Sequence, residues 1–173
     1  MKGDVDLSLI NRALILERTR FQNYKNMSKE VSNLEGKEVL IKLAKIEKKH
    51  YVLLKKQIKS LRKFNQVNLD AIKDNEIKLL KKEKNFRRAT SSIDNDINLV
   101  KKAEVLERGD PPFYDHLSTQ TKDKGLKKVF SFLEKEEAKH LKVLKSKVRQ
   151  LENLSLKLSV ANDPRAMFYE MTR

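Results

Sequence analysis

The spacing of apolar residues predicts a chain built from long helices. Apolar positions recur at steps of three and four along four stretches, so that each stretch carries one apolar face. The stretches run from about Asp6 to Leu34, from about 37 to 64, from 93 to 107 and from just after Gly125 to about Leu158. Few segments show strand periodicity, and only four glycines and three prolines interrupt the chain. We therefore expect an all-α domain.

Three interruptions organise these helices. Gly36 is the expected break between the first two, and so short a loop predicts an antiparallel hairpin. Residues 65–90 are basic and weakly periodic, which indicates a crossover with a short helix around 77–82. The run Gly109-Asp110-Pro111-Pro112 must end or kink the third helix, because a proline has no N–H to donate to a helix carbonyl. The pattern resumes beyond it, at about 113–117.

Candidate capping residues precede two of the helices. Asp4 and Asp6 stand near the start of the first, where a carboxylate can accept from free backbone N–H groups. Ser91 or Ser92 is the expected cap of the third helix.

The length and composition of the chain limit its domain number and the kinds of site that it can carry. The length of 173 residues fits one domain, which we expect over residues 1–160, with a tail at 161–173 that docks on the bundle or a partner. The chain has no cysteine, which excludes disulfides, iron–sulfur clusters and thiol nucleophiles. No apolar run is long enough for a secretory signal or a membrane span, so we expect a cytoplasmic protein.

The formal net charge is +15. A basic surface can serve a nucleic acid or another polyanion. The lysines are spread along every predicted helix rather than gathered in one tail, which favours a solvated surface with no specific anionic partner.

The two halves of the chain repeat each other at a period of 90 residues. Each half has a glutamate, a tyrosine seven residues later, and a Glu-x-x-His unit that begins thirty residues after the first glutamate. The matching residues are Glu17 and Glu107, Tyr24 and Tyr114, Glu47 and Glu137, and His50 and His140. The chain is therefore predicted to be a duplicated helical hairpin.

The polar residues of this repeat are unusual because several fall on apolar stripes. Glu17, His50, Glu107 and His140 lie where buried residues are expected, and unpaired buried carboxylates are very unfavourable. Two divalent cations would remove this conflict, since carboxylates can bridge metals and imidazoles supply neutral nitrogens. The alternative is that each Glu-x-x-His is a solvated i,i+3 pair, or that the duplication kept the pattern without the metal.

The motifs ALILER-x5-Y with EKKH, and AEVLER-x5-Y with EAKH, resemble the rubrerythrin branch of the ferritin-like superfamily. The resemblance covers about residues 10–55 and 97–145. It implies a ferritin-like four-helix bundle of two antiparallel hairpins joined by a long crossover, with two iron ions. It implies that Glu17 and Glu107 are terminal ligands, that Glu47 and Glu137 bridge the metals, and that His50 and His140 bind one metal each. Tyr24 and Tyr114 would lie near the site as hydrogen-bond donors or as core residues.

Three departures from the family pattern affect these expectations. The absence of cysteine excludes the rubredoxin-type domain that rubrerythrins usually carry, so electrons must come from an external donor. The break after Glu107 could pull that residue out of place. Rubrerythrins also have an extra carboxylate on the third helix, for which Glu104 and Asp110 are candidates, although we slightly favour surface charges for both. His116 lies off the stripe and is expected at the surface.

The function that the resemblance best supports is that of a non-haem di-iron oxidoreductase. Two ferrous ions would each give one electron to hydrogen peroxide or dioxygen, as peroxide reduction or iron oxidation in oxidative-stress defence. Manganese with catalase-like chemistry stays open. One alternative is a di-iron hydroxylase acting on tRNA or another nucleic acid, and another is a metal-free bundle that binds nucleic acid or a partner helix. A homodimer is expected from the family.

Overall fold

The computed structural model describes residues 2–73 and 93–161. The described elements are α1 (Lys2–Glu30), α2 (Leu34–Phe64), α3 (Asp70–Lys73), α4 (Ile93–Glu107), α5 (Asp110–Gln120) and α6 (Lys124–Ala161). No strand occurs within these ranges, so the expected all-α class is confirmed. The expected helix at 77–82, the caps at Ser91 or Ser92 and the tail from 162 lie outside the described residues.

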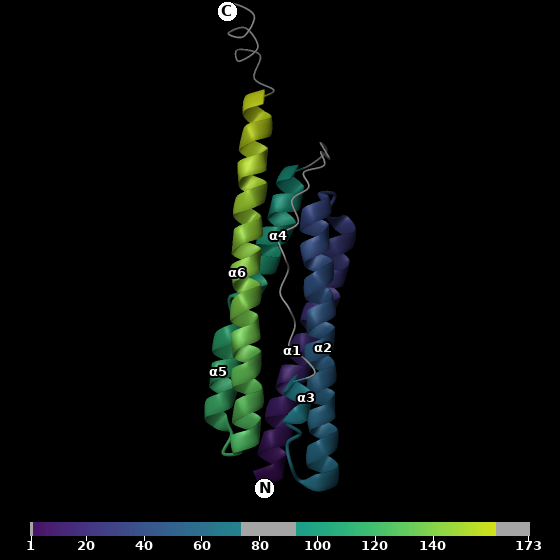
Figure 1. Ribbon diagram of the computed structural model, residues 1–173, viewed down its shortest axis with the longest axis vertical. Helices are drawn as coiled ribbons and strands as arrows, with labels where there is room; N and C mark the ends of the chain where they lie inside the picture. The colour runs from purple at the N-terminus through teal and green to yellow at the C-terminus, as the bar shows by residue number, and fades with distance from the viewer. Residues whose placement is uncertain (1, 74–92, 162–173) are drawn as a thin grey trace, which may run out of the picture.

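Two antiparallel hairpins form the bundle. The first pairs α1 with α2, and the second pairs α6 with α4 and α5 end to end (Figure 1). The hairpins meet where α2 packs on α6 and where α1 contacts α4 and α5. This is the expected ferritin-like four-helix bundle, with its third helix broken into α4 and α5. No helix in the described part of the chain is long and apolar enough to cross a membrane.

The turn between α1 and α2 differs from its prediction. α1 ends at Glu30, and Asn33 caps α2 by accepting a hydrogen bond from the backbone N–H of Gly36 at 2.9 Å. Gly36 therefore lies in the first turn of α2 and is not the break. A Cβ at Gly36 would lie 3.1 Å from Val31 Cγ1, so the glycine allows a close approach of the preceding loop. The signal that decides the break is the capping side chain of Asn33.

The predicted caps of α1 are also wrong. Asp4 and Asp6 lie inside α1, which begins at Lys2. Asp6 is buried, and its Oδ1 accepts a hydrogen bond from Thr121 Oγ1 at 2.6 Å. Its carboxylate therefore ties α1 to the loop before α6.

The proline run ends a helix as predicted. α4 stops at Glu107, and α5 begins at Asp110 with Pro111 and Pro112 in its first turn, where their missing N–H groups would be unsatisfied in any case. α6 begins at Lys124, where Asp123 Oδ1 accepts from the N–H of Leu126 at 2.9 Å. The break in the third helix of the bundle therefore falls directly after Glu107.

Two apolar clusters fill the bundle. One is built around Tyr24, Leu40, Val100 and Leu144, and the other around Ile10, Leu53, Tyr114, Phe130 and Leu133. Each cluster takes residues from both hairpins, which holds the halves together through burial of apolar surface. The buried residues of the chain also include glutamates and histidines that belong to neither cluster.

Candidate metal centre

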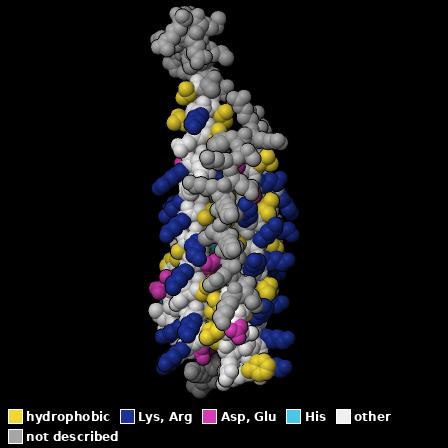
Figure 2. Space-filling view, in the orientation of Figure 1, with side chains coloured by type: hydrophobic (Ala, Val, Ile, Leu, Met, Phe, Trp, Pro, Cys, Tyr) yellow, Lys and Arg dark blue, Asp and Glu magenta, His cyan; other side chains and the backbone are white. Residues whose placement is uncertain are grey.

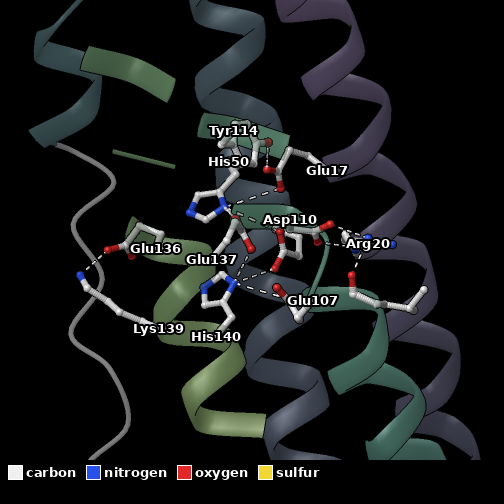
Figure 3. A network of polar contacts seen from close by, with 12 residues as sticks. Glu17, Arg20, His50, Glu107, Asp110, Tyr114, Glu136, Glu137, Lys139 and His140 are labelled. Atoms are coloured by element: carbon white, nitrogen blue, oxygen red, sulfur yellow. Dashed lines mark hydrogen bonds and ion pairs between the residues drawn. The ribbon is translucent and has the colours of Figure 1, made fainter. Parts of the chain in front are cut away.

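All four long helices of the bundle, α1, α2, α4 and α6, contribute to one buried polar site (Figure 3). α1 and α4 each supply one glutamate, and α2 and α6 each supply a glutamate and a histidine at i and i+3, which share a helix face. All six residues are at most 1% exposed. They are Glu17, Glu47, His50, Glu107, Glu137 and His140. The structure thus brings together the whole predicted ligand set, and the break after Glu107 leaves that residue in the site.

The six residues form two overlapping groups. In each group, one ligand atom per residue lies within 4.8 Å of the others. The groups are Glu17, Glu47, His50 and Glu137, and Glu47, Glu107, Glu137 and His140. Glu47 and Glu137 belong to both groups, so these carboxylates can serve two neighbouring ions.

Both histidines turn the Nδ1 atom toward the carboxylates. His50 Nδ1 lies 3.0 Å from Glu137 Oε1. His140 Nδ1 lies 3.1 Å from Glu47 Oε1 and 2.9 Å from Glu137 Oε2. The two rings are stacked with centroids 5.6 Å apart. Nδ1 is therefore the nitrogen of each ring that can bind an ion in this site.

Many polar atoms of the site have no hydrogen-bond partner although they are buried. Among the described residues, all the unpartnered buried side-chain nitrogens and oxygens belong to these six side chains. They are Glu17 Oε2, both oxygens of Glu47, both nitrogens of His50, Glu107 Oε2, Glu137 Oε1 and His140 Nε2. Native interiors rarely tolerate such groups. A set of carboxylate oxygens and imidazole nitrogens fits iron, manganese or zinc, so the donor chemistry suits a di-metal centre.

Each terminal glutamate is held by a tyrosine from the other half of the chain. Tyr24 donates a hydrogen bond to Glu107 Oε1 at 2.5 Å, and Tyr114 donates to Glu17 Oε1. The other oxygen of each glutamate is the unpartnered one. Burial and the nearby carboxylates raise the pKa of both tyrosines well above its ordinary value, so both stay protonated donors. The two tyrosines thus aim one oxygen of each carboxylate into the site.

The environment separates the four carboxyl groups into two kinds. Burial and the charges of Glu47 and Glu137 raise the pKa of Glu17 and of Glu107. Burial also acts to raise the pKa of Glu47 and Glu137, but the contacts with His140 and His50 outweigh it and lower both values. The two shared glutamates therefore favour the ionised form, while the pKa of each terminal glutamate lies above its ordinary value in the absence of metal.

The pKa of each histidine is raised for the complementary reason. Burial acts to lower it, but the carboxylates around each ring outweigh that effect, chiefly Glu17 for His50 and Glu137 for His140. Both rings therefore favour the protonated form without metal.

The candidates for the extra carboxylate are buried, against the surface position that we favoured. Asp110 is 2% exposed and binds Arg20 through two hydrogen bonds of 2.5 Å. Glu104 is 7% exposed and pairs with Arg108 at 2.8 Å. Neither belongs to the two ligand groups, so the extra carboxylate stays a prediction. His116 is exposed, as expected.

The apolar stripe of α6 is compatible with either Glu136 or Glu137 facing inward. The structure buries both. Glu137 joins the ligand groups, whereas Glu136 accepts from Lys139 Nζ at 2.5 Å and lies near both histidines. Periodicity alone cannot show which of two adjacent glutamates on a helix faces the site.

Comparison with known proteins agrees with this geometry. A family model described as Rubrerythrin matches residues 8–148. Among solved structures, the chain is similar to one described as a hypothetical protein, Pfu-1136390-001, from Pyrococcus furiosus. The two are 22% identical, with a TM-score of 0.64 over 86% of this chain and 91% of that chain, which shows a shared fold. No curated protein matches the sequence significantly.

Proposed function

Because the chain belongs to the rubrerythrin family, we propose that it is a non-haem di-iron oxidoreductase whose centre lies between the four glutamates and two histidines. The observation that carries this proposal is the set of unpartnered buried polar atoms on those six side chains. Without metal, only the ion pairs between the histidines and the carboxylates would offset the desolvation penalty of these atoms in the middle of the bundle.

The ligand roles follow from membership of the two groups. Glu47 and Glu137, which belong to both, are the proposed bridging ligands, and Glu17 and Glu107 the terminal ones. His50 and His140 would each bind one ion through Nδ1, the nitrogen that faces the carboxylates. Manganese suits the same donors, so the metal is decided by experiment.

The proposed reaction is reduction of hydrogen peroxide or oxidation of ferrous iron. Bound ferrous ions would supply the two electrons that convert one hydrogen peroxide and two protons into two waters. The chain's own groups hold the site in order: Tyr24 and Tyr114 keep their protons and orient the terminal carboxylates. Since the chain has no cysteine, an external donor would return the electrons.

Metal content tests the proposal. The protein should be purified after growth with iron and manganese, beside a Glu47→Ala, Glu137→Ala variant. Glu30→Ala, Glu134→Ala is the matched control, since neither residue belongs to a ligand group. We expect about two iron per chain in the wild type and the control and none in the site variant. Two manganese would move the chemistry toward catalase, and no metal after anaerobic reconstitution with ferrous iron would refute the centre.

Peroxide consumption then tests the activity. Reduced, iron-loaded protein should consume one hydrogen peroxide for each pair of ferrous ions oxidised, and the site variant should not. Consumption no faster than that of free ferrous iron would refute the oxidoreductase proposal while leaving the metal centre intact.

A second candidate function, action on a nucleic acid, is favoured by one basic groove. Lys and Arg side chains line both sides of the visible face along its length (Figure 2), which does not single out a partner site. However, a groove of about 540 Å³ between α1 and α2 carries four basic residues and no acidic one. They are Lys55, Lys59, Arg62 and Lys63. These positions lie beyond His50 along α2, so an anionic substrate bound there would lie further along the same helix than the centre.

Fluorescence anisotropy with labelled tRNA tests this candidate. Lys59→Glu, Arg62→Glu should weaken binding at least tenfold if the groove is the site, while Lys127→Glu, Lys128→Glu gives the same charge change on an exposed part of α6. Equal loss in both variants would indicate nonspecific attraction to the net charge and refute a groove-specific function.

A further inference from the structure

The two metal-binding histidines each have a second ring nitrogen that the proposed centre does not use. Nε2 of His50 and Nε2 of His140 are buried and have no hydrogen-bond partner. The rings are stacked at an interplanar angle of 15°, and Figure 3 shows the second nitrogen of both rings on the same side of the stack. In Figure 3 that side lies away from the carboxylates bound by Nδ1 and toward Glu136.

Metal binding fixes the chemistry of these nitrogens. An imidazole that binds an ion through Nδ1 uses that lone pair, so its proton must be on Nε2. Each loaded histidine then presents a buried N–H donor, and a buried donor without an acceptor is strongly unfavourable. The centre therefore needs an acceptor on this side.

Glu136 is placed to be that acceptor. A carboxylate oxygen of Glu136 and one ring nitrogen of each histidine lie within 4.8 Å of one another. This separation is spanned by one water molecule, or is closed to a direct hydrogen bond by a small side-chain rotation. Glu136 is 4% exposed, and it is one residue before Glu137 and four before His140 on the same helix.

Lys139 supplies the charge that Glu136 needs in this position. Its Nζ donates to Glu136 Oε1 at 2.5 Å, and its side chain is 49% exposed. This ion pair gives the carboxylate a cationic partner at the edge of the bundle and uses only one of its two oxygens. One oxygen thus faces a cation near solvent while the carboxylate still has acceptor capacity toward the rings.

We propose that Glu136 is a positioning residue that orients both metal-binding histidines by accepting hydrogen bonds from their Nε2–H groups, directly or through one water. One carboxylate would then hold the rings of both ions in the same tautomer and link the two halves of the centre. This inference rests on the proposed di-metal function.

Binding of Co(II) and Zn(II) to the full chain tests the inference. Co(II) affinity and stoichiometry would be read from the visible absorption of the ion, and the Nε2–H protons from NMR of ¹⁵N-histidine protein loaded with Zn(II). Glu136→Gln removes the charge at nearly constant volume. Glu134→Gln is the control, since it makes the same change on α6 at a half-buried residue outside the ligand groups.

The expected result is two Co(II) per chain in all three proteins, with affinity about 10- to 100-fold lower in Glu136→Gln alone, as for other hydrogen-bond partners of metal ligands. Both Nε2–H signals should be present in Zn(II)-loaded wild type and control, and should move or exchange faster in Glu136→Gln. Lys139→Gln should give a smaller shift of the same signals.

Three results would overturn the inference. Wild-type affinity and unchanged Nε2–H signals in Glu136→Gln would show that Glu136 does not act on the histidines, while leaving the di-metal centre in place. A third Co(II) that disappears in Glu136→Gln would show that Nε2 and Glu136 are themselves ligands. A wild type that binds no Co(II) or Zn(II) would refute the proposed centre together with this inference.

Discussion

Arg20 and Asp110 occupy equivalent positions in the two halves of the chain, 90 residues apart, and form a two-bond ion pair with each other. Arg20 also donates to the backbone carbonyl of Leu106 at 2.8 Å. The pair joins α1 to the first turn of α5, directly after the break that follows Glu107. The repeat is therefore symmetric in its proposed ligands and tyrosines but asymmetric here, where opposite charges hold the broken helix in place.

We expect Arg20→Met to destabilise the metal-free protein by about 3–5 kcal/mol, because it leaves the carboxylate of Asp110 buried without a cation. Burial already raises the pKa of Asp110 to about 6 despite Arg20. Asp110→Asn alone and both changes together complete a double-mutant cycle, measured by urea unfolding. The double variant should lose much less than the sum of the single variants, whereas additive losses would show that the pair contributes no coupling.

Much of this architecture could be predicted from sequence because its signals are local or periodic. The spacing of apolar residues predicted the helices, and Pro111 and Pro112 predicted the break in the third helix. The 90-residue repeat predicted that Glu17 and Glu107 are equivalent. These features depend only on helix geometry and on the missing proline N–H.

The contacts that could not be predicted depend on partners far apart in the chain. The turn before α2 is held by Asp96, whose carboxylate accepts from the backbone N–H groups of Ser32 and Asn33 at 2.8 and 2.6 Å. Nothing near Gly36 indicates this contact, which supports the turn that Asn33 caps. The burial of Asp110 likewise depends on Arg20, which lies 90 residues earlier in the chain, and pairing between helices is not readable from periodicity.

The tyrosine hydrogen bonds predict two nearly equal losses. Tyr24→Phe and Tyr114→Phe each remove one donor to a buried glutamate of the opposite half. Each should destabilise the metal-free protein by about 1–3 kcal/mol, since the released oxygen stays buried. Thermal unfolding measures this, and Tyr51→Phe is the control because Tyr51 lies at a partly exposed position. Losses no larger than that of the control would contradict the role of both hydroxyls.

Substitution of the two terminal glutamates should affect metal binding without lowering the stability of the metal-free protein. Because burial and neighbouring carboxylates raise the pKa of Glu17 and Glu107, a neutral glutamine of the same shape should fit the metal-free site. We therefore expect Glu17→Gln, Glu107→Gln to leave metal-free stability within about 1 kcal/mol of wild type or to increase it. The same variant should lose most of the rise in melting temperature that Co(II) gives the wild type. A large loss of metal-free stability would show that these carboxylates are structural.

Metal loading should release protons. The carboxylates beside His50 and His140 outweigh the opposing effect of burial and raise the pKa of both rings well above the ordinary value, so both are protonated near neutral pH in the metal-free site. An ion binds only the neutral ring, so loading must displace at least these two protons, and affinity should fall as the pH falls.

The raised pKa values of the two histidines also determine how the stability of the metal-free protein changes with pH. A group whose pKa is raised by folding contributes stability that is complete below its unfolded pKa and is lost as the pH rises through its folded pKa. The metal-free protein should therefore lose stability as the pH rises from the unfolded pKa of the histidines through their raised folded pKa, while the loaded protein, whose rings carry metal instead, should not. Calorimetric titration of Co(II) in two buffers of different ionisation enthalpy, with the Glu47→Ala, Glu137→Ala variant as control, counts the protons. Binding without proton release at about pH 7 would show that the rings are already neutral and that the carboxylates do not raise their pKa.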